Sequence, residues 1–299
     1  MRYVFFILIT SLFSAGTSYP GMNNWYHPTR LALAGSGGAY SSVTADVVNP
    51  ASLWTLKQLL DVSFISYPAD IQAQSFHLVL PKKSSVTVYG MRHLNYGLFE
   101  GRNSDNQKTG TYNASDTWFD WAAAGHSSQW PITWGMSAGL FLSSIQNKQS
   151  AAVTLSAGVL IDFVGLDSKV GINLANLGSV IKTYTGQEEP LPTLLEISFS
   201  RKLAHLPLVI VIDMVSQTRF EKYVFRFGGI FSLPHGLELK LGTTTNRFDQ
   251  SINKNITKNL FSDTGIGLGW NFDIYYIESS IYSYGPGGWI SGVAVGIQF

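Results

Sequence analysis

Alternation of large apolar residues with small or polar residues is the feature that most constrains how this chain can fold. It recurs over about ten residues at a time, the length of a tilted membrane-spanning strand. Residues 151–162, 237–242 and 265–272 show it, and the last eleven residues show it most clearly. There, one face carries Trp289, Ser291, Val293, Val295, Ile297 and Phe299, and the other carries Ile290, Gly292, Ala294, Gly296 and Gln298. A period of two predicts β-strands with one apolar face.

About fourteen such segments can be recognised, an even number as bacterial outer-membrane barrels require. Their expected first residues are Leu59, Ile71, Ser85, Asp116, Ile132, Ser150, Leu166, Thr193, Leu206, Lys222, Leu237, Thr264, Asp273 and Trp289.

The connections between these segments alternate between short and long. Tight turns are expected at residues 82–84, 129–131, 163–165, 204–205 and 234–236, and long loops at 95–115, 178–192 and 246–263. Short turns at one end and long loops at the other are typical of outer-membrane barrels. A soluble β-sandwich is the alternative, but it gives no reason for separating loops by length. The pattern therefore predicts an all-β, transmembrane, antiparallel β-barrel of about fourteen strands.

The low charge of the chain agrees with an apolar outer surface. Charged residues make up 13% of the 299 residues, against roughly 25% in soluble domains. The net charge of +1 argues against nucleic acid as a partner. The absence of cysteine excludes disulfide frameworks and thiolate metal sites.

Residues 1–18 are interpreted as a secretory signal peptide. Arg2 supplies the positive charge, residues 4–13 form the apolar stretch, and small residues follow it. Ten apolar residues are too few to span a bilayer, which takes about 20. The longest later apolar run, 206–212, contains Pro207 and ends at Asp213. A strand-built barrel in the bacterial outer membrane, over residues 58–299, is the expected result.

Residues 19–57 depart from the alternation and are rich in Gly, Ala, Ser, Asn and Pro. This stretch is too apolar for a solvated linker and too glycine-rich for a strand, so we expect an N-terminal plug (hatch) in the barrel mouth. Small residues would let its backbone approach the wall closely. The residues assigned to the plug motif are Gly35, Gly37, Gly38, Ala39, Asp46, Asn49, Pro50, Ala51 and Leu53.

These same residues carry a resemblance to a known family. The run Gly35-Ser-Gly-Gly-Ala-Tyr40, followed by Asp46 and by Asn49-Pro-Ala-Ser-Leu53, resembles the signature of the FadL-like outer-membrane barrel superfamily. Further stretches at 94–100, 111–116, 171–178 and 203–208 make the chain most similar to its PorV/PorQ family. The resemblance implies a fourteen-stranded barrel with an N-terminal plug.

The resemblance also implies a PorQ-like role in type IX protein secretion and surface attachment. In that role the extracellular loops hold a surface-exposed protein, a PorZ-like or other attachment-complex subunit, while the barrel contacts outer-membrane lipid. The loop residues expected to contact the partner are Tyr96, Phe99, Tyr112, Tyr184 and Phe248. The alternatives are a general structural, porin-like barrel and a FadL-type channel for the uptake of hydrophobic molecules. Such a channel predicts a gap in the wall or a displaceable plug.

No catalytic residue, cofactor or metal site is expected. Residues 135–139 match a nucleophile elbow, but they lie inside an alternating strand, where Ser137 faces the lumen. The glycines at 35–38 lack the βαβ surroundings of a nucleotide loop, and the six histidines are scattered. Several charged residues are expected inside the lumen, paired with each other or with plug residues such as Asp46. They are Arg92, Glu196, Lys202, Asp213, Arg226, Glu238 and Lys240.

Overall fold

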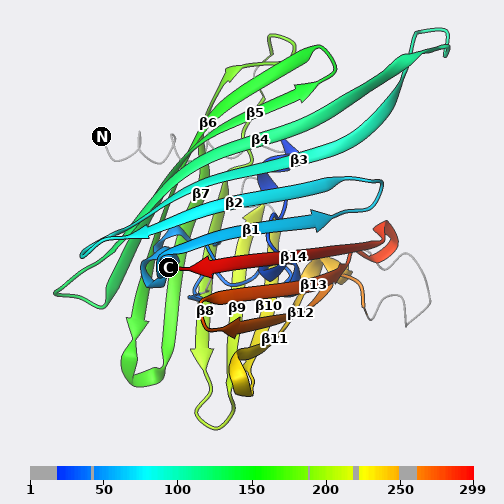
Figure 1. The fold of residues 1–299 in the computed structure, drawn as a ribbon. Helices are drawn as coiled ribbons and strands as arrows, with labels where there is room; N and C mark the ends of the chain where they lie inside the picture. Colours follow the sequence, from blue (N-terminus) through cyan, green and yellow to red (C-terminus); the bar gives the residue numbers. More distant parts are fainter. Residues whose placement is uncertain (1–18, 42–43, 188, 218–221, 249–260) are drawn as a thin grey trace.

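Fourteen antiparallel strands close into a single barrel in the computed structural model (Figure 1), which describes residues 19–41, 44–187, 189–217, 222–248 and 261–299. Each strand pairs with its neighbours in the chain, and β1 pairs with β14. Because all strands belong to one closed sheet, the β-sandwich considered as the alternative, which needs two open sheets, is excluded. The strands are β1 (Leu59–Ser66), β2 (Gln72–Pro81), β3 (Val86–Arg102), β4 (Lys108–His126), β5 (Ile132–Ile145), β6 (Lys148–Phe163), β7 (Ser168–Lys182), β8 (Leu194–Lys202), β9 (Leu208–Gln217), β10 (Lys222–Ser232), β11 (Leu237–Thr244), β12 (Thr264–Phe272), β13 (Tyr275–Ser283) and β14 (Trp289–Gln298).

The predicted strand starts agree with the structure within two residues, apart from β4. That strand begins at Lys108 rather than at 116, so most of the loop expected at 95–115 is a hairpin of β3 and β4. A bulge after Asn95, with Gly97 at a φ of +84°, interrupts the pairing, which then continues to Arg102. This hairpin extends past the neighbouring strands (Figure 1). Solvent surrounds both of its faces there, so its sequence has no apolar face to reveal the strands.

The two other long loops also differ from the expectation. Strand β7 continues to Lys182, which shortens the loop expected at 178–192. Of the loop expected at 246–263, the structure describes the 3₁₀ turn η5 (Thr245–Phe248) and the residues from 261 onward. The expected signal peptide lies outside the described residues. The expected tight turns are present, two of them as the 3₁₀ turns η3 (Val164–Leu166) and η4 (Pro234–Gly236).

The outer surface of the barrel is apolar and the inner surface is small or polar. On β1, Val62 and Phe64 point outward and are 47% and 38% exposed, whereas Asp61 and Ser63, which alternate with them, are buried. On β14, Val293 is likewise exposed and its neighbours on either side face inward. Large apolar residues therefore cover the outside, the reverse of a soluble protein. Among the described residues, no helix has the length and apolarity needed to cross a membrane.

The N-terminal segment, residues 19–57, packs against the inner face of the barrel. It contains η1 (Pro20–Asn23), α2 (Pro28–Ala32) and η2 (Pro50–Thr55), and a further turn, η6 (Gly285–Gly287), lies outside it before β14. Helix α2 contacts β1 and β11–β14, while η2 contacts β4–β6 on another part of the wall. Figure 1 shows the segment in blue between the strands. The N-terminal segment therefore contacts strands from both halves of the chain.

Candidate functional site

Glycines on the barrel wall leave room for the backbone of the N-terminal segment. A Cβ added to Gly242 of β11 would lie 2.5 Å from the Cα and carbonyl oxygen of Leu33. The same holds for Gly135 of β5, where a Cβ would overlap the backbone of Pro50 and Ala51. Such distances are shorter than any real contact. The segment is therefore seated on the wall where the wall has no side chain, a close approach that only glycine permits.

Asn49 fixes the second half of the segment to strands β6 and β7. Its Oδ1 accepts a hydrogen bond from the Ala51 amide at 2.9 Å, which caps the turn η2, and Pro50 suits the first position of that turn. Its Nδ2 donates to the carbonyl oxygens of Val159 at 3.3 Å and Ile172 at 3.4 Å. The Asn-Pro-Ala element thus combines a cap with two bonds to the barrel wall.

The glycine-rich stretch of the segment binds two charged wall residues. The amides of Gly37 and Gly38 donate to Asp213 Oδ2 at 2.6 and 3.1 Å. Gly37 has a φ of +120°, which a residue with a side chain rarely adopts. Arg226 donates to the carbonyl oxygen of Gly35 at 3.1 Å. The expected pairing of interior charges with the N-terminal segment is therefore confirmed for Asp213 and Arg226.

Other interior charges pair across the wall itself. Lys240 Nζ is 2.7 Å from Glu278 Oε2 and 3.3 Å from Glu238 Oε2, and Lys240 and Glu278 are fully buried. Thr29 of α2 joins this group by donating to Glu278 at 2.6 Å. Arg92 binds Asp120 at 3.1 Å, and Arg226 lies 3.9 Å from Glu196. Lys202 differs from the prediction, because it lies exposed at the end of β8.

The residues just before the glycine-rich stretch were missed by the sequence reasoning. His27 caps α2 by accepting from the Thr29 amide at 3.2 Å, and its Nε2 lies 3.4 Å from Asp61 Oδ1. Tyr26 is buried, donates to the Gly21 carbonyl at 2.8 Å and accepts from Ser63 through its own carbonyl. A His-Pro pair preceding a short apolar run was the available signal, since Pro favours the first turn of a helix.

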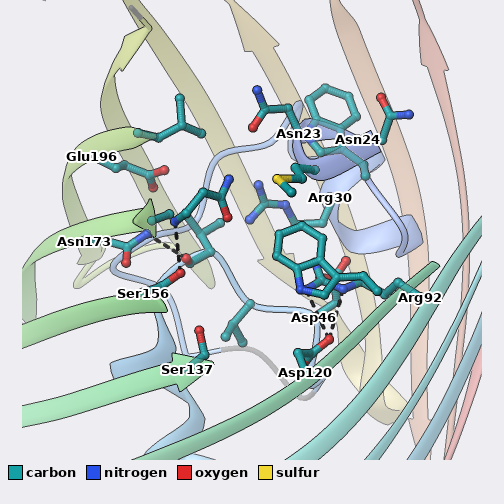
Figure 2. A pocket seen from close by; sticks show the side chains of 18 of the residues that line it. Asn23, Asn24, Arg30, Asp46, Arg92, Asp120, Ser137, Ser156, Asn173 and Glu196 are labelled. Carbon is teal, nitrogen blue, oxygen red and sulfur yellow. Dashed lines mark hydrogen bonds and ion pairs between the residues drawn. The ribbon is translucent and has the colours of Figure 1, made fainter. Parts of the chain in front are cut away.

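A cavity of about 400 Å³ lies inside the barrel beside the N-terminal segment (Figure 2). Its walls combine Met22, Trp25 and Trp118 with many polar groups. Arg30 and Asp46 come from the segment, and Arg92 and Asp120 from strands β3 and β4. Burial lowers the pKa of the Arg30 guanidinium, and the attraction of Asp46 opposes that effect. We refer to this cavity as the inner chamber. The polar residues that line it include Asn23, Asn24, Ser137, Ser156, Asn173, Glu196 and Asn246.

The remaining plug-motif residues are buried in the same region. Ala39 is fully buried and its carbonyl oxygen accepts from Ser200 at 2.8 Å. Leu53 packs in an apolar cluster with Leu59, Val79 and Val88 of the wall. Asp46 is only half-buried and faces the inner chamber (Figure 2), which Pro50 and Leu53 also line.

The five loop residues expected to contact a partner fall into two groups. Tyr96 and Tyr184 are turned inward: the Tyr96 hydroxyl donates to Asp116 at 2.7 Å, and Tyr184 stacks on Tyr19 with ring centroids 6.1 Å apart. Tyr96 lies on β3 rather than in a loop, whereas Tyr184 lies in the loop between β7 and β8 as expected. Both rings pack against the N-terminal segment.

The other three lie toward the outside. Phe99 and Tyr112 stack on each other across the β3–β4 hairpin, with centroids 5.4 Å apart, and Phe248 is 72% exposed at the end of η5. Contact with a partner stays a prediction for all five residues. Ser137 lies in the middle of β5, as expected, and not at a strand-to-helix turn.

Comparison with known proteins shows a shared fold. No protein-family profile matches the sequence, and no curated protein sequence matches it significantly. Among solved structures, the P. putida toluene transporter TodX is similar with a TM-score of 0.59 at 10% identity, covering 92% of this chain and 98% of that one. The Ralstonia pickettii toluene transporter TbuX gives a TM-score of 0.59 at 12% identity over the same shares. The barrel thus shares its fold with these two transporters. These likenesses do not single out the PorV/PorQ family.

Proposed function

We propose that this chain is a channel of the bacterial outer membrane that admits hydrophobic small molecules. The observation that carries the proposal is the shared fold with two toluene transporters along nearly the whole length of both chains. The alternative considered from the sequence is therefore better supported than the PorQ-like role. Neither role requires a catalytic residue, and we propose none.

The outer surface supports a location in a bilayer. Most outward-facing residues of β1 and β14 are aliphatic or aromatic, and Trp134, Trp270 and Trp289 are exposed on the same surface. In water such a surface would promote aggregation, but in lipid it costs nothing. Tryptophan rings on a barrel exterior suit the boundary between lipid and water. Residues 1–18 fit export to the bacterial outer membrane, as the signal peptide of this proposal.

The N-terminal segment fits the role of a plug in this channel. It is seated on glycines of β5 and β11, and it is held by hydrogen bonds from Asn49 and to Asp213. Most of these contacts are single hydrogen bonds, each worth about 0.5–1.5 kcal/mol. A segment held in this way can shift without opening the barrel wall, whose strands are joined by continuous backbone ladders. Entry of a guest would then require only local movement.

Uptake of a labelled hydrocarbon tests this proposal. The full chain, with its signal, is expressed in a bacterium that lacks hydrocarbon transporters, and entry of radiolabelled toluene into the cells is measured. We expect faster entry than in cells carrying an empty vector, and no gain from a chain that lacks residues 1–18 and stays inside. Equal rates with and without the protein, when it is present in the outer membrane, would refute the channel.

The β3–β4 hairpin favours a second role, the holding of a surface protein. The hairpin extends beyond the wall, and its Leu98 is 76% exposed. Its Phe99 and Tyr112 stack on each other. Exposed apolar and aromatic residues at such a tip are suited to protein contact. Isolation of the protein from its own outer membrane in mild detergent tests this role. A stoichiometric partner that is lost when residues 98–110 are replaced by a short Gly-Ser turn would support it, and its absence would exclude it.

A further inference from the structure

Two opposite charges of the inner chamber stand without a partner. Within the part of the chain that the structure describes, neither the Arg30 guanidinium nor the Asp46 carboxylate has a hydrogen-bond or ion-pair partner. Asp46 is nevertheless the carboxylate that stabilises charged Arg30 most strongly. The two groups therefore attract each other across the chamber without touching (Figure 2).

Arg92 lines the same chamber and is an interior arginine whose guanidinium has protein partners. It binds Asp120 through Nε at 3.2 Å and through Nη2 at 3.1 Å. Its guanidinium carbon also lies 4.1 Å from the centroid of the Trp118 ring and 5.6 Å from that of Tyr26. Arg92 is thus held from both sides by the protein. Arg30 has the same chemistry and none of these contacts.

An interior guanidinium with five free donors is unfavourable unless something accepts from it, because buried charges are normally paired. Water can do this, and so can the anionic group of a guest. The carboxylate of Asp46 requires the opposite kind of group, a donor with positive charge. Asn23 and Asn24, which line the same chamber, add uncharged donors and acceptors.

We propose that the inner chamber binds a small zwitterion, whose anionic group is recognised by Arg30 and whose ammonium group is recognised by Asp46. One molecule of this class satisfies both charges at once, which neither a simple anion nor a simple cation does. A guest with an apolar body would also contact Met22 and Trp118. The volume of about 400 Å³ equals that of roughly a dozen waters and accommodates a molecule the size of an amino acid.

This site goes beyond the proposed channel for hydrophobic molecules. It concerns binding at one chamber, which is measured on purified protein without transport. A failure of toluene uptake would leave it standing, and its own failure would leave the channel standing.

Three probes with similar branched carbon skeletons test the proposal. Leucine is the zwitterion, 4-methylpentanoate has only the carboxylate, and 3-methylbutylamine has only the ammonium group. Binding of each to the full mature chain in a non-ionic detergent is measured by titration calorimetry at pH 7. We expect leucine to bind at one molecule per chain, and each singly charged probe to bind at least tenfold more weakly.

Two substitutions locate the site. R30Q and D46N each remove one charge and keep a hydrogen-bonding side chain of similar size, and each should weaken leucine binding at least tenfold. With R30Q, leucine should bind no better than the amine, and with D46N no better than the acid. The matched control is R102Q, which removes an arginine that pairs with Glu100 on the exposed hairpin tip and should leave binding unchanged.

Other results would overturn the proposal. Equal binding of leucine and 4-methylpentanoate would show an anion site, and equal binding of leucine and the amine would show a cation site. Absence of leucine binding would mean that the chamber holds water only, and binding that survives both R30Q and D46N would show that leucine binds without these two charges; either result overturns the proposal. Heat-modifiable gel migration of each variant verifies that the barrel is folded, so that a loss of binding is read as a change at the site.

Discussion

Gly242 offers the sharpest test of how the N-terminal segment is seated. The change is Gly242→Ala, which adds one methyl carbon at a point 2.5 Å from the Cα and carbonyl oxygen of Leu33. An ordinary contact needs about 3.4 Å or more, so the segment has to move by about 1 Å. Leu33 is the C-cap residue of α2, and its carbonyl accepts from the Ser36 amide at 2.9 Å and the Ser36 hydroxyl at 2.7 Å. A shift there disturbs the link between α2 and the glycine-rich stretch.

The expected cost follows from these contacts. Overpacking against backbone costs about 1–3 kcal/mol, and weakening one or two hydrogen bonds adds about 0.5–1.5 kcal/mol each. We expect the seated state to lose about 2–3 kcal/mol, which lowers its population relative to displaced states by roughly 30- to 150-fold. The barrel wall is unaffected, because Gly242 keeps its backbone pairing with Gly228 and Gly265.

Ion conductance in planar bilayers is the assay, with limited proteolysis of residues 19–57 as a second readout. Gly242→Ala should increase conductance and speed cleavage of the segment. The control is Gly269→Ala on the neighbouring strand β12, where the nearest atoms to an added Cβ lie 3.5 Å away and no movement is required. If Gly242→Ala folds, as heat-modifiable migration shows, and yet conducts and resists protease like Gly269→Ala, the seating argument is wrong.

Three further predictions follow from contacts described above. Asp213→Ala removes the acceptor of the Gly37 and Gly38 amides. This should weaken the binding of the N-terminal segment to the wall by about 2–4 kcal/mol, so that protease cleaves the segment faster. An unchanged cleavage rate would contradict this prediction. Lys240→Met leaves Glu278 buried without its cation. It should lower the free energy of unfolding of the barrel, measured in detergent, by about 3–5 kcal/mol. The double variant with Glu278→Gln should recover part of that stability. Val295→Lys places a charge on the exposed outer face and should cost about 2–4 kcal/mol when refolding into bilayers is measured; no cost would argue against lipid contact at this strand.

The barrel could be predicted from the sequence because the outer and inner faces of its strands have different surroundings. Val293 and Val295 alternate with Gly292 and Ala294 on β14, and that contrast of exposed apolar positions with buried small ones marks a strand. The same rule explains the error at β4. Residues 108–113 pair with β3 but extend beyond the end of β5, and they form a strand without the alternation that would reveal it.

The seating of the N-terminal segment was only partly predictable. The small residues around Gly37 and the Asn49 element indicated close backbone approach, but they could not indicate which wall residues would receive it. That information lies in pairs far apart in the chain, such as Gly37 with Asp213 and Leu33 with Gly242. Tyr96 and Tyr184 were placed outside for the same reason. An aromatic residue near a loop is suited to either side, and only packing against Tyr19 and Tyr26 decides it.

The position of α2 has a consequence for the order in which the molecule is built. Helix α2 lies near the start of the described chain, yet it contacts β11–β14, the last strands to be made. These partners do not exist while the first half of the barrel forms, and contacts this distant in sequence form slowly. The pairing of β1 with β14 then seals the wall around the helix. Helix α2 can therefore make its final contacts only when these last strands are in place, and we expect the N-terminal segment to dock as the β1–β14 pairing closes the barrel.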